Sequence, residues 1–230
     1  MGHIAENLNY LRDDIARELR QSGRPENDVR LIVVSKTVSL EAIREAYRAG
    51  ARDFGENRIQ EALPKTESLD LPEIAWHFIG HLQSNKVNKA VGCFEMIQSV
   101  DSLELARRID QQAGETGTRP TLLLEIKTSP EETKYGYSRD QLMRDLPELL
   151  KLDRIRIAGL MTIAEYSDQE RRVRQCFQAL RRLADELKSC RSDHFEMLHL
   201  SMGMSHDYRW AIQEGSTMVR IGSAVFGPRI

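Results

Sequence analysis

The sequence predicts an α/β protein that folds as a single (β/α)8 TIM barrel with an extra N-terminal helix. Short apolar runs alternate eight times with helical patterns, which indicates parallel strands joined by crossover helices. Eight such units in a chain of this length are typical of a closed barrel. No Pro/Ser-rich linker and no change in composition divides the chain. We therefore expect one domain over residues 1–230, with an open doubly wound sheet as the structural alternative.

The first half of the chain holds the N-terminal helix and four strand–helix units. Apolar residues recur at spacings of three and four from Ile4 to Leu19, and Gly23 with Pro25 ends this helix. It lies outside the repeat, and we expect it to plug the barrel floor or to pack along the side. Ser39 is placed to cap the next helix. The expected strands are residues 31–36, 53–57, 75–79 and 94–100.

The second half repeats the same rhythm. A polar loop over residues 128–136 precedes a helix that ends near Leu150. Val173, Phe177 and Leu180 lie on one face of a long helix. Residues 205–213 form the expected helix after the seventh strand, closed by Gly215. The expected strands are residues 121–127, 155–160, 197–200 and 218–221.

Charge and composition exclude several classes of function. The chain has 33 basic and 35 acidic residues and a net charge of -2, which gives no electrostatic basis for a nucleic-acid or membrane partner. Apolar runs are too short to span a membrane, and the N-terminus lacks the apolar core of a signal peptide. We therefore expect a cytoplasmic protein. The three cysteines are far apart and odd in number, which argues against a disulfide framework.

Polar residues follow most of the expected strands, where the functional face of a barrel lies. Lys36 ends the first buried strand. Its amine either reaches solvent or, when neutral, attacks a carbonyl group such as the aldehyde of pyridoxal phosphate. The other residues at these strand ends include Glu56, Asn57, His77, His81, Gln83, Asp101, Lys127, Lys134, Met161 and Thr162.

The last two units suggest an anion site. Residues 201–205 (S-M-G-M-S) follow the seventh strand, and Gly222 with Ser223 follows the eighth. Exposed amides and hydroxyls at these two ends suit a phosphate, although turn formation alone also favours Gly and Ser. Arg220 shares a strand face with Gly222, where it either forms a structural ion pair or donates to a ligand ring nitrogen and keeps it unprotonated.

Other motifs are absent or broken. His77 and His81 are four residues apart, but Gly80 and the expected strand disrupt the helical geometry that a metal pair needs, so no metal site is predicted. The chain has no G-x-S-x-G, G-x-G-x-x-G or Walker-type motif.

Several segments resemble the pyridoxal phosphate homeostasis protein family, whose fold is similar to the N-terminal barrel of alanine racemase. The resemblance spans residues from about 4 to 229 and is specific in its longer motifs. The segments are residues 34–37, 54–57 with Gln60 and Glu61, 76–86, 159–161, 200–205 and 218–222.

The resemblance implies pyridoxal 5'-phosphate as cofactor, held as a Schiff base on Lys36. It implies that Arg220 faces the pyridine nitrogen and that Lys134 takes part in cofactor transfer. It also implies that Asn57 lies beside the cofactor and that its phosphate is surrounded by Ser201, Gly203, Met204, Gly222 and Ser223. His77 and Met161 are further expected cofactor-binding residues.

Three positions depart from the family pattern. Ser223 stands where threonine is usual, and His206 stands where aspartate is frequent. The loop over residues 128–137, which contains Lys134, is only loosely similar. Ser223 keeps the hydroxyl group, whereas the loop puts the role of Lys134 in doubt.

By this resemblance, we expect a non-catalytic protein that buffers pyridoxal phosphate in the cell and delivers it to recipient apo-enzymes, as a monomer or weak dimer. The alternatives are a pyridoxal phosphate-dependent enzyme acting on amino acids, such as a weak racemase, and a barrel enzyme for another phosphorylated metabolite. Alanine racemases take a second base, a tyrosine, from an additional β-domain. Because this chain ends just after the eighth strand, we expect no two-base racemase.

Overall fold

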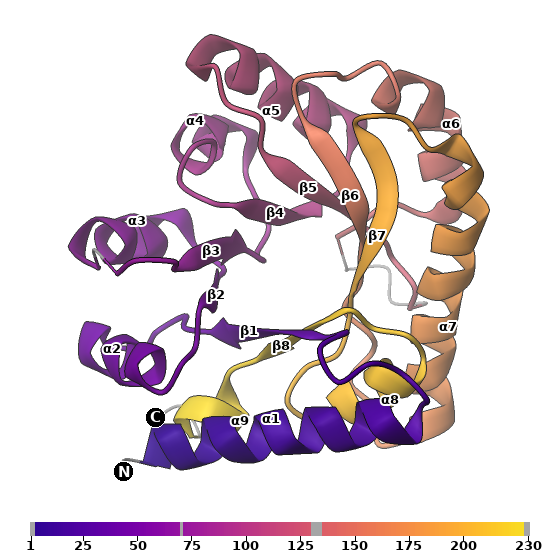
Figure 1. Ribbon diagram of the computed structural model, residues 1–230. Coiled ribbons are helices and arrows are strands. Elements are labelled where there is room, and N and C mark those ends of the chain that lie inside the picture. Colours follow the sequence, from indigo (N-terminus) through magenta and orange to yellow (C-terminus); the bar gives the residue numbers. More distant parts are fainter. Residues whose placement is uncertain (1–2, 70, 130–134, 228–230) are drawn as a thin grey trace.

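The computed structural model describes residues 3–69, 71–129 and 135–227 and contains a closed barrel of eight parallel strands (Figure 1). The strands follow chain order around the barrel, and pairing between the first and the last closes it. The prediction of a TIM barrel is confirmed, and the open-sheet alternative is wrong. The strands are β1 Arg30–Val34, β2 Asp53–Glu56, β3 Ala75–Phe78, β4 Met96–Val100, β5 Thr121–Glu125, β6 Arg156–Met161, β7 Phe195–Ser201 and β8 Met218–Ile221.

Helices surround the barrel on its outer side, as Figure 1 shows. Within the described ranges, no helix is long and apolar enough to cross a membrane. The α-helices are α1 His3–Gln21, α2 Leu40–Arg48, α3 Ile59–Ser68, α4 Val87–Ala90, α5 Leu103–Thr116, α6 Arg139–Leu149, α7 Glu170–Leu187, α8 Tyr208–Gln213 and α9 Ser223–Phe226. Two 3-10 turns, η1 Ser84–Lys86 and η2 Lys188–Cys190, adjoin α4 and α7.

Element boundaries differ from the expected ones where strands end. β1 ends at Val34, so Lys36 lies in a turn two residues beyond the last strand residue. α8 begins only at Tyr208, because residues 205–207 form turns. The short helix α9 was not expected.

Serine side chains begin several of the helices. The Oγ atoms of Ser39 and Ser102 each accept a hydrogen bond from a first-turn amide at 3.3 Å. Ser138 forms a capping box with Gln141. These bonds satisfy amides that have no partner within a helix, which explains the predicted start of α2 after Ser39.

The core has two parts because side chains alternate along each strand. One set packs outward against the helices, and the other fills the barrel interior. The interior apolar cluster consists of Ile32, Met96, Leu123, Ala158, Met161 and Met218. Two residues further along their strands, Gln98, Glu125 and Arg220 follow Met96, Leu123 and Met218 on the same inward face. On these three strands a polar side chain therefore follows an apolar one toward the carboxyl end of the barrel interior.

Helix α1 packs along the side of the barrel, next to α8 and α9 (Figure 1). Of the two expected arrangements, the structure has this one. Asp14 is fully buried, accepts hydrogen bonds from Tyr208 Oη at 2.5 Å and Arg209 Nε at 2.7 Å, and also pairs with Arg17. These bonds join α1 to the segment that follows β7.

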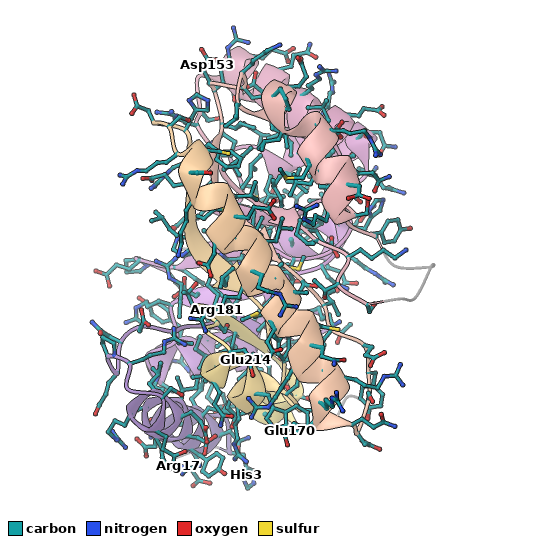
Figure 2. All side chains as sticks on the ribbon, turned by 90° about the vertical axis from the view of Figure 1, so that its right-hand side faces the viewer. His3, Arg17, Asp153, Glu170, Arg181 and Glu214 are labelled. Carbon is teal, nitrogen blue, oxygen red and sulfur yellow. The ribbon has the colours of Figure 1, made fainter. Side chains whose placement is uncertain are left out.

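Helix α7 lies across the side of the molecule in Figure 2, with Glu170 near one end and Glu214 beside it. Arg174 joins the two acidic residues, with Nε 2.6 Å from Glu170 Oε1 and Nη1 2.9 Å from Glu214 Oε1. Arg174 thus joins α7 to the end of α8.

We expect Asp14→Ala to lower the free energy of unfolding by about 2–3 kcal/mol, because a buried carboxylate with charged hydrogen-bond donors is lost. The exposed neighbour Asp13→Ala is the control and is expected to change it by less than about 0.5 kcal/mol. Urea denaturation of both variants measures the difference. Equal destabilisation would show that the bonds of Asp14 do not stabilise the α1–α8 contact.

Candidate functional site

A cavity of about 530 Å³ opens at the carboxyl ends of the strands, a size typical of small-molecule sites. Six of the predicted site residues line it: Lys36, Asn57, Met204, Arg220, Gly222 and Ser223. Ser205 of the predicted anion segment and His81 of the strand-end residues also line it. The lining residues that were not predicted are Val34, Ile79, Gly80, Glu125, Tyr135, Ile163 and His206.

The turn that presents Lys36 is held from below by a buried ion pair. Lys65, on α3, donates from Nζ to Ser35 O and to Glu56 Oε1, both at 2.7 Å. Ser35 Oγ also donates to Glu56 Oε1 at 2.6 Å. Lys36 itself is half-buried, and Thr37 adopts a left-handed φ of 61°. The carbonyl immediately before Lys36 is therefore fixed by a lysine that the sequence did not single out.

The two loops predicted to hold an anion meet at the cavity. Ser205 Oγ accepts a hydrogen bond from Ala224 N at 3.4 Å, which joins the loop after β7 to the first turn of α9. Asp207 Oδ1 accepts from Met204 N at 2.6 Å and closes the first loop on itself. Hydroxyls and small residues from both loops thus line one wall.

Gly203 gives this wall its close packing. Its φ is 95°, and a Cβ atom there would lie 2.6 Å from the Cβ of Ala211. Gly203 O also accepts a hydrogen bond from Arg220 N at 2.9 Å. Gly203 therefore supports the loop after β7 and β8, and it is not among the described residues that line the cavity.

Arg220 lies in the barrel interior with only 4% of its surface exposed. Its Nη1 donates to Ser201 Oγ at 2.6 Å and its Nη2 to Thr162 O at 2.8 Å. Desolvation by burial lowers the pKa of Arg220 to about 10, against the opposing effect of Asp207 and Glu125. Because this pKa is well above neutrality, Arg220 presents a positive charge to the cavity at physiological pH.

A chain of hydrogen bonds continues from Arg220 toward the barrel floor. Ser201 Oγ lies 2.6 Å from Gln98 Oε1, Gln98 Nε2 lies 3.2 Å from His77 Nδ1, and His77 Nε2 lies 2.9 Å from Asp53 Oδ1. An arginine can only donate, so Ser201 accepts from it and donates onward to Gln98. Gln98 then donates to His77, which carries its proton on Nε2 and donates to Asp53.

This chain places three predicted residues below the cavity. His77 and Ser201 are fully buried members of the hydrogen-bonded chain, and Met161 belongs to the interior apolar cluster. None of the three is among the described residues that line the cavity. Gln98, which links Ser201 to His77, was missed, although its alternation with Met96 marks it as an inward polar residue.

Glu125, at the end of β5, lines the cavity on the side opposite Lys36. It is 8% exposed, and desolvation by burial raises the pKa of its carboxyl group to about 7, with Asp101 adding to the rise and Arg220 opposing it. A carboxyl group that titrates near neutrality inside a cavity is typical of functional sites. Its alternation with Leu123 could have revealed it.

Aromatic rings line the rim of the cavity. His81 stacks on Tyr135 with a centroid distance of 3.9 Å, and its Nδ1 lies 3.2 Å from Asp101 Oδ2. His77 is inside the barrel and His81 is at the rim, so the two histidines do not converge on one point. In the part of the chain that the structure describes, no three metal-binding side chains cluster. Lys134 lies outside the described residues.

The fold and this cavity define a (β/α)8 barrel protein with a lysine, a buried arginine and hydroxyl-bearing loops on its carboxyl face. The model of the alanine racemase N-terminal domain matches residues 7–229. The Pyridoxal phosphate homeostasis protein of Aquifex aeolicus is 42% identical over 227 residues, which is 99% of each chain. The chain therefore belongs to the pyridoxal phosphate homeostasis protein family.

Solved structures agree with this placement. PipY of Synechococcus elongatus, in a structure with PLP bound, has a TM-score of 0.86 and 43% identity, covering 97% of this chain and 100% of PipY. Alanine racemase of Clostridium difficile has a TM-score of 0.79 at 16% identity, covering 99% of this chain and 57% of the racemase. The second similarity concerns the barrel fold alone.

We expect Lys65→Met to destabilise the protein by about 3–5 kcal/mol, because Glu56 loses its buried counter-ion. Replacing both partners, as in Lys65→Met with Glu56→Leu, removes that unpaired charge and should restore part of the loss. Chemical denaturation at pH 7 measures both, with the exposed Lys89→Met as control. A single variant as stable as the control would contradict this account of the turn.

We expect Gln98→Leu to cost about 1–3 kcal/mol, because the hydroxyl of Ser201 and Nδ1 of His77 lose their buried partner. Gln111→Leu, an exposed change on α5, serves as the matched control with little expected effect. The comparison is made by thermal and urea unfolding. No difference between the two variants would mean that the chain below Arg220 contributes nothing to stability.

Proposed function

We propose that this protein binds pyridoxal 5'-phosphate (PLP) on Lys36 and buffers and delivers the cofactor without catalysing a reaction on it. The observation that supports this most is the meeting of Lys36, the buried Arg220 and the two anion-suited loops in one cavity. The names of the relatives and the PLP-bound PipY structure support the same cofactor. Residues 1–230 would act as a single domain, as a monomer or weak dimer, and recipient apo-enzymes would be its partners.

The cavity residues fit the chemical groups of PLP. When bound, the cofactor supplies an aldehyde that condenses reversibly with a neutral amine. Lys36 supplies that amine from a turn held by Lys65. Met204, Gly222 and Ser223 would hold the phosphate through loop amides and a hydroxyl, and Asn57 would lie beside the ring.

Arg220 has a specific part in holding the cofactor. A guanidinium group has donors and no acceptor, so it can bind a pyridine nitrogen only when that nitrogen is unprotonated. Its hydrogen bonds to Ser201 and Thr162 keep the guanidinium in place. An unprotonated ring withdraws electrons less strongly than a protonated one. Arg220 would therefore hold the ring in its less electron-withdrawing form.

The experiment is cofactor loading of the wild type and of Lys36→Ala. We expect an absorption band of lysine-bound PLP in the wild type and its loss in Lys36→Ala. Borohydride reduction should leave one pyridoxyl group on the peptide that contains Lys36. Lys89→Ala, an exposed lysine on α4, is the control and should load normally. A wild-type chain that forms no band with PLP would overturn the proposal.

A second measurement tests the non-catalytic part. The PLP-loaded protein is incubated in deuterated water with a panel of amino acids, and incorporation of deuterium at the α-carbon is followed by mass spectrometry. We expect incorporation no faster than with free PLP. Exchange that exceeds this background and is lost in Lys36→Ala would instead make the protein an enzyme acting on amino acids.

A further inference from the structure

We propose that Glu125 is the recognition site for a primary ammonium group, and that the amine which takes the cofactor from Lys36 binds there. This inference rests on the proposed function, because it concerns how the cofactor leaves. It assigns a chemical class to the accepting group: a primary amine, in its protonated form, that enters the cavity from the carboxyl face of the barrel.

Glu125 lies across the cavity from Lys36. β5 is four strands away from β1 in either direction around the closed barrel, so the two residues approach the cavity from opposite walls. Alternation along β5 places Glu125 on the same inward face as Leu123, a member of the interior apolar cluster. A molecule that contacts Glu125 therefore lies inside the barrel mouth with Lys36 on the far side.

The carboxylate of Glu125 has no hydrogen-bond or ion-pair partner among residues 3–69, 71–129 and 135–227. This is unusual for a residue that is more than nine-tenths buried, because buried polar groups normally have a hydrogen-bond partner. The guanidinium of Arg220 lowers the pKa of Glu125, but its two Nη atoms donate to Ser201 and Thr162. Glu125 thus has acceptor capacity that faces the cavity.

The charges around Glu125 select a cation. Asp101, which follows β4, adds negative charge on one side, and Arg220 adds positive charge from β8. His81 is bonded to Asp101 at the rim, and His206 lies in the loop after β7. Burial and Asp101 both disfavour the ionised carboxyl, so a cation that neutralises it is bound more favourably than an anion or a neutral alcohol.

Several features favour an ammonium group over a metal ion. In the described part of the chain no three metal-binding side chains cluster, so a divalent cation would have too few ligands. The walls include the apolar residues Val34, Ile79 and Ile163, which suit the carbon skeleton of an organic amine. An ammonium has three donors, and Glu125 supplies an acceptor.

The transfer step balances without any further reactant. The bound ammonium gives one proton to the carboxylate of Glu125 and becomes a neutral amine. Its nitrogen then forms a bond to the aldehyde carbon that Lys36 holds, and the bond between that carbon and Lys36 breaks. Lys36 leaves as an amine and takes back the proton from Glu125. No electron donor or acceptor is required.

The kinetic test compares the wild type, Glu125→Gln and the exposed control Glu115→Gln, all loaded with PLP. Propylamine is added, and loss of the lysine-bound absorption band is timed. We expect Glu125→Gln to lower the amine-driven rate about tenfold or more, the effect of losing a charge-assisted hydrogen bond. Release without amine is timed for each protein and subtracted, and the control Glu115→Gln should release as the wild type does.

The pH dependence separates recognition from packing. The carboxyl group of Glu125 is protonated below its pKa of about 7 and can then accept no proton. The Glu125→Gln variant reacts only with the free amine, whose fraction rises about tenfold per pH unit in this range, whereas the wild type takes up the ammonium and needs only the carboxylate of Glu125. The ratio of the wild-type rate to the Glu125→Gln rate should therefore fall from pH 6 to pH 8, most steeply above the pKa of Glu125. A ratio of one at every pH would overturn the inference.

A binding measurement on the cofactor-free protein provides a readout that does not depend on transfer. The 13C signal of the Glu125 carboxyl group is titrated with pH, with and without propylammonium. We expect propylammonium to lower the apparent pKa of Glu125, because it stabilises the carboxylate, and propanol to leave it unchanged. An unchanged pKa with both compounds would overturn the inference.

The outcomes also separate the two proposals. If the wild type never forms the PLP band, the proposed function fails, while the 13C titration still tests Glu125. If the wild type loads and Glu125→Gln transfers PLP as fast, only the inference about Glu125 fails. If Glu125→Gln cannot retain PLP even without amine, Glu125 contacts the cofactor itself, which likewise overturns its assignment as the amine site.

Discussion

The guanidinium of Arg220 inside the barrel sets the constraint on which the upper half of the interior depends. Arginine keeps its charge when buried, so its donors must meet acceptors. Ser201 Oγ and Thr162 O supply two of them, and Gly203 O holds the backbone amide of the same residue. From Ser201 the hydrogen bonds continue through Gln98 and His77 to the carboxylate of Asp53 near the barrel floor. A positive charge at the cavity is thus connected to a negative charge below it.

The same constraint divides the barrel interior into two regions. An apolar cluster that includes Leu123 and Met218 fills part of the space, and the polar chain fills the rest. The carboxyl group of Glu125 lies above Leu123, close enough to Arg220 for the two to influence each other's pKa. The cavity therefore has a permanent cation on one wall and a carboxyl group near half-ionisation on the other. Such a pair can hold an anionic cofactor and still bind a cationic acceptor.

Much of the fold followed from the sequence, and so did part of the site. Eight alternations of strand and helix predicted the closed barrel, and Ser39 predicted where α2 begins. The S-M-G-M-S loop and Gly222 with Ser223 were expected to meet at one rim, and they do. The strand ends were less accurate, because strand length depends on pairing with the neighbouring strands. β1 stops at Val34, and Lys36 lies in the turn that follows it.

The sequence by itself determined the barrel, the order of its strands and the lysine and loops at its carboxyl face, since these depend on local patterns and chain order. Tertiary structure decided how deep each side chain lies. His77, Met161 and Ser201 stand at strand ends as Arg220 does, yet they lie beneath the cavity because the tilt and stagger of barrel strands set their height. Gln98 and Lys65 gained roles only through partners elsewhere in the chain, and Glu125 only through its place in the cavity. Burial and hydrogen bonding across a barrel are long-range properties, and a linear pattern does not contain them.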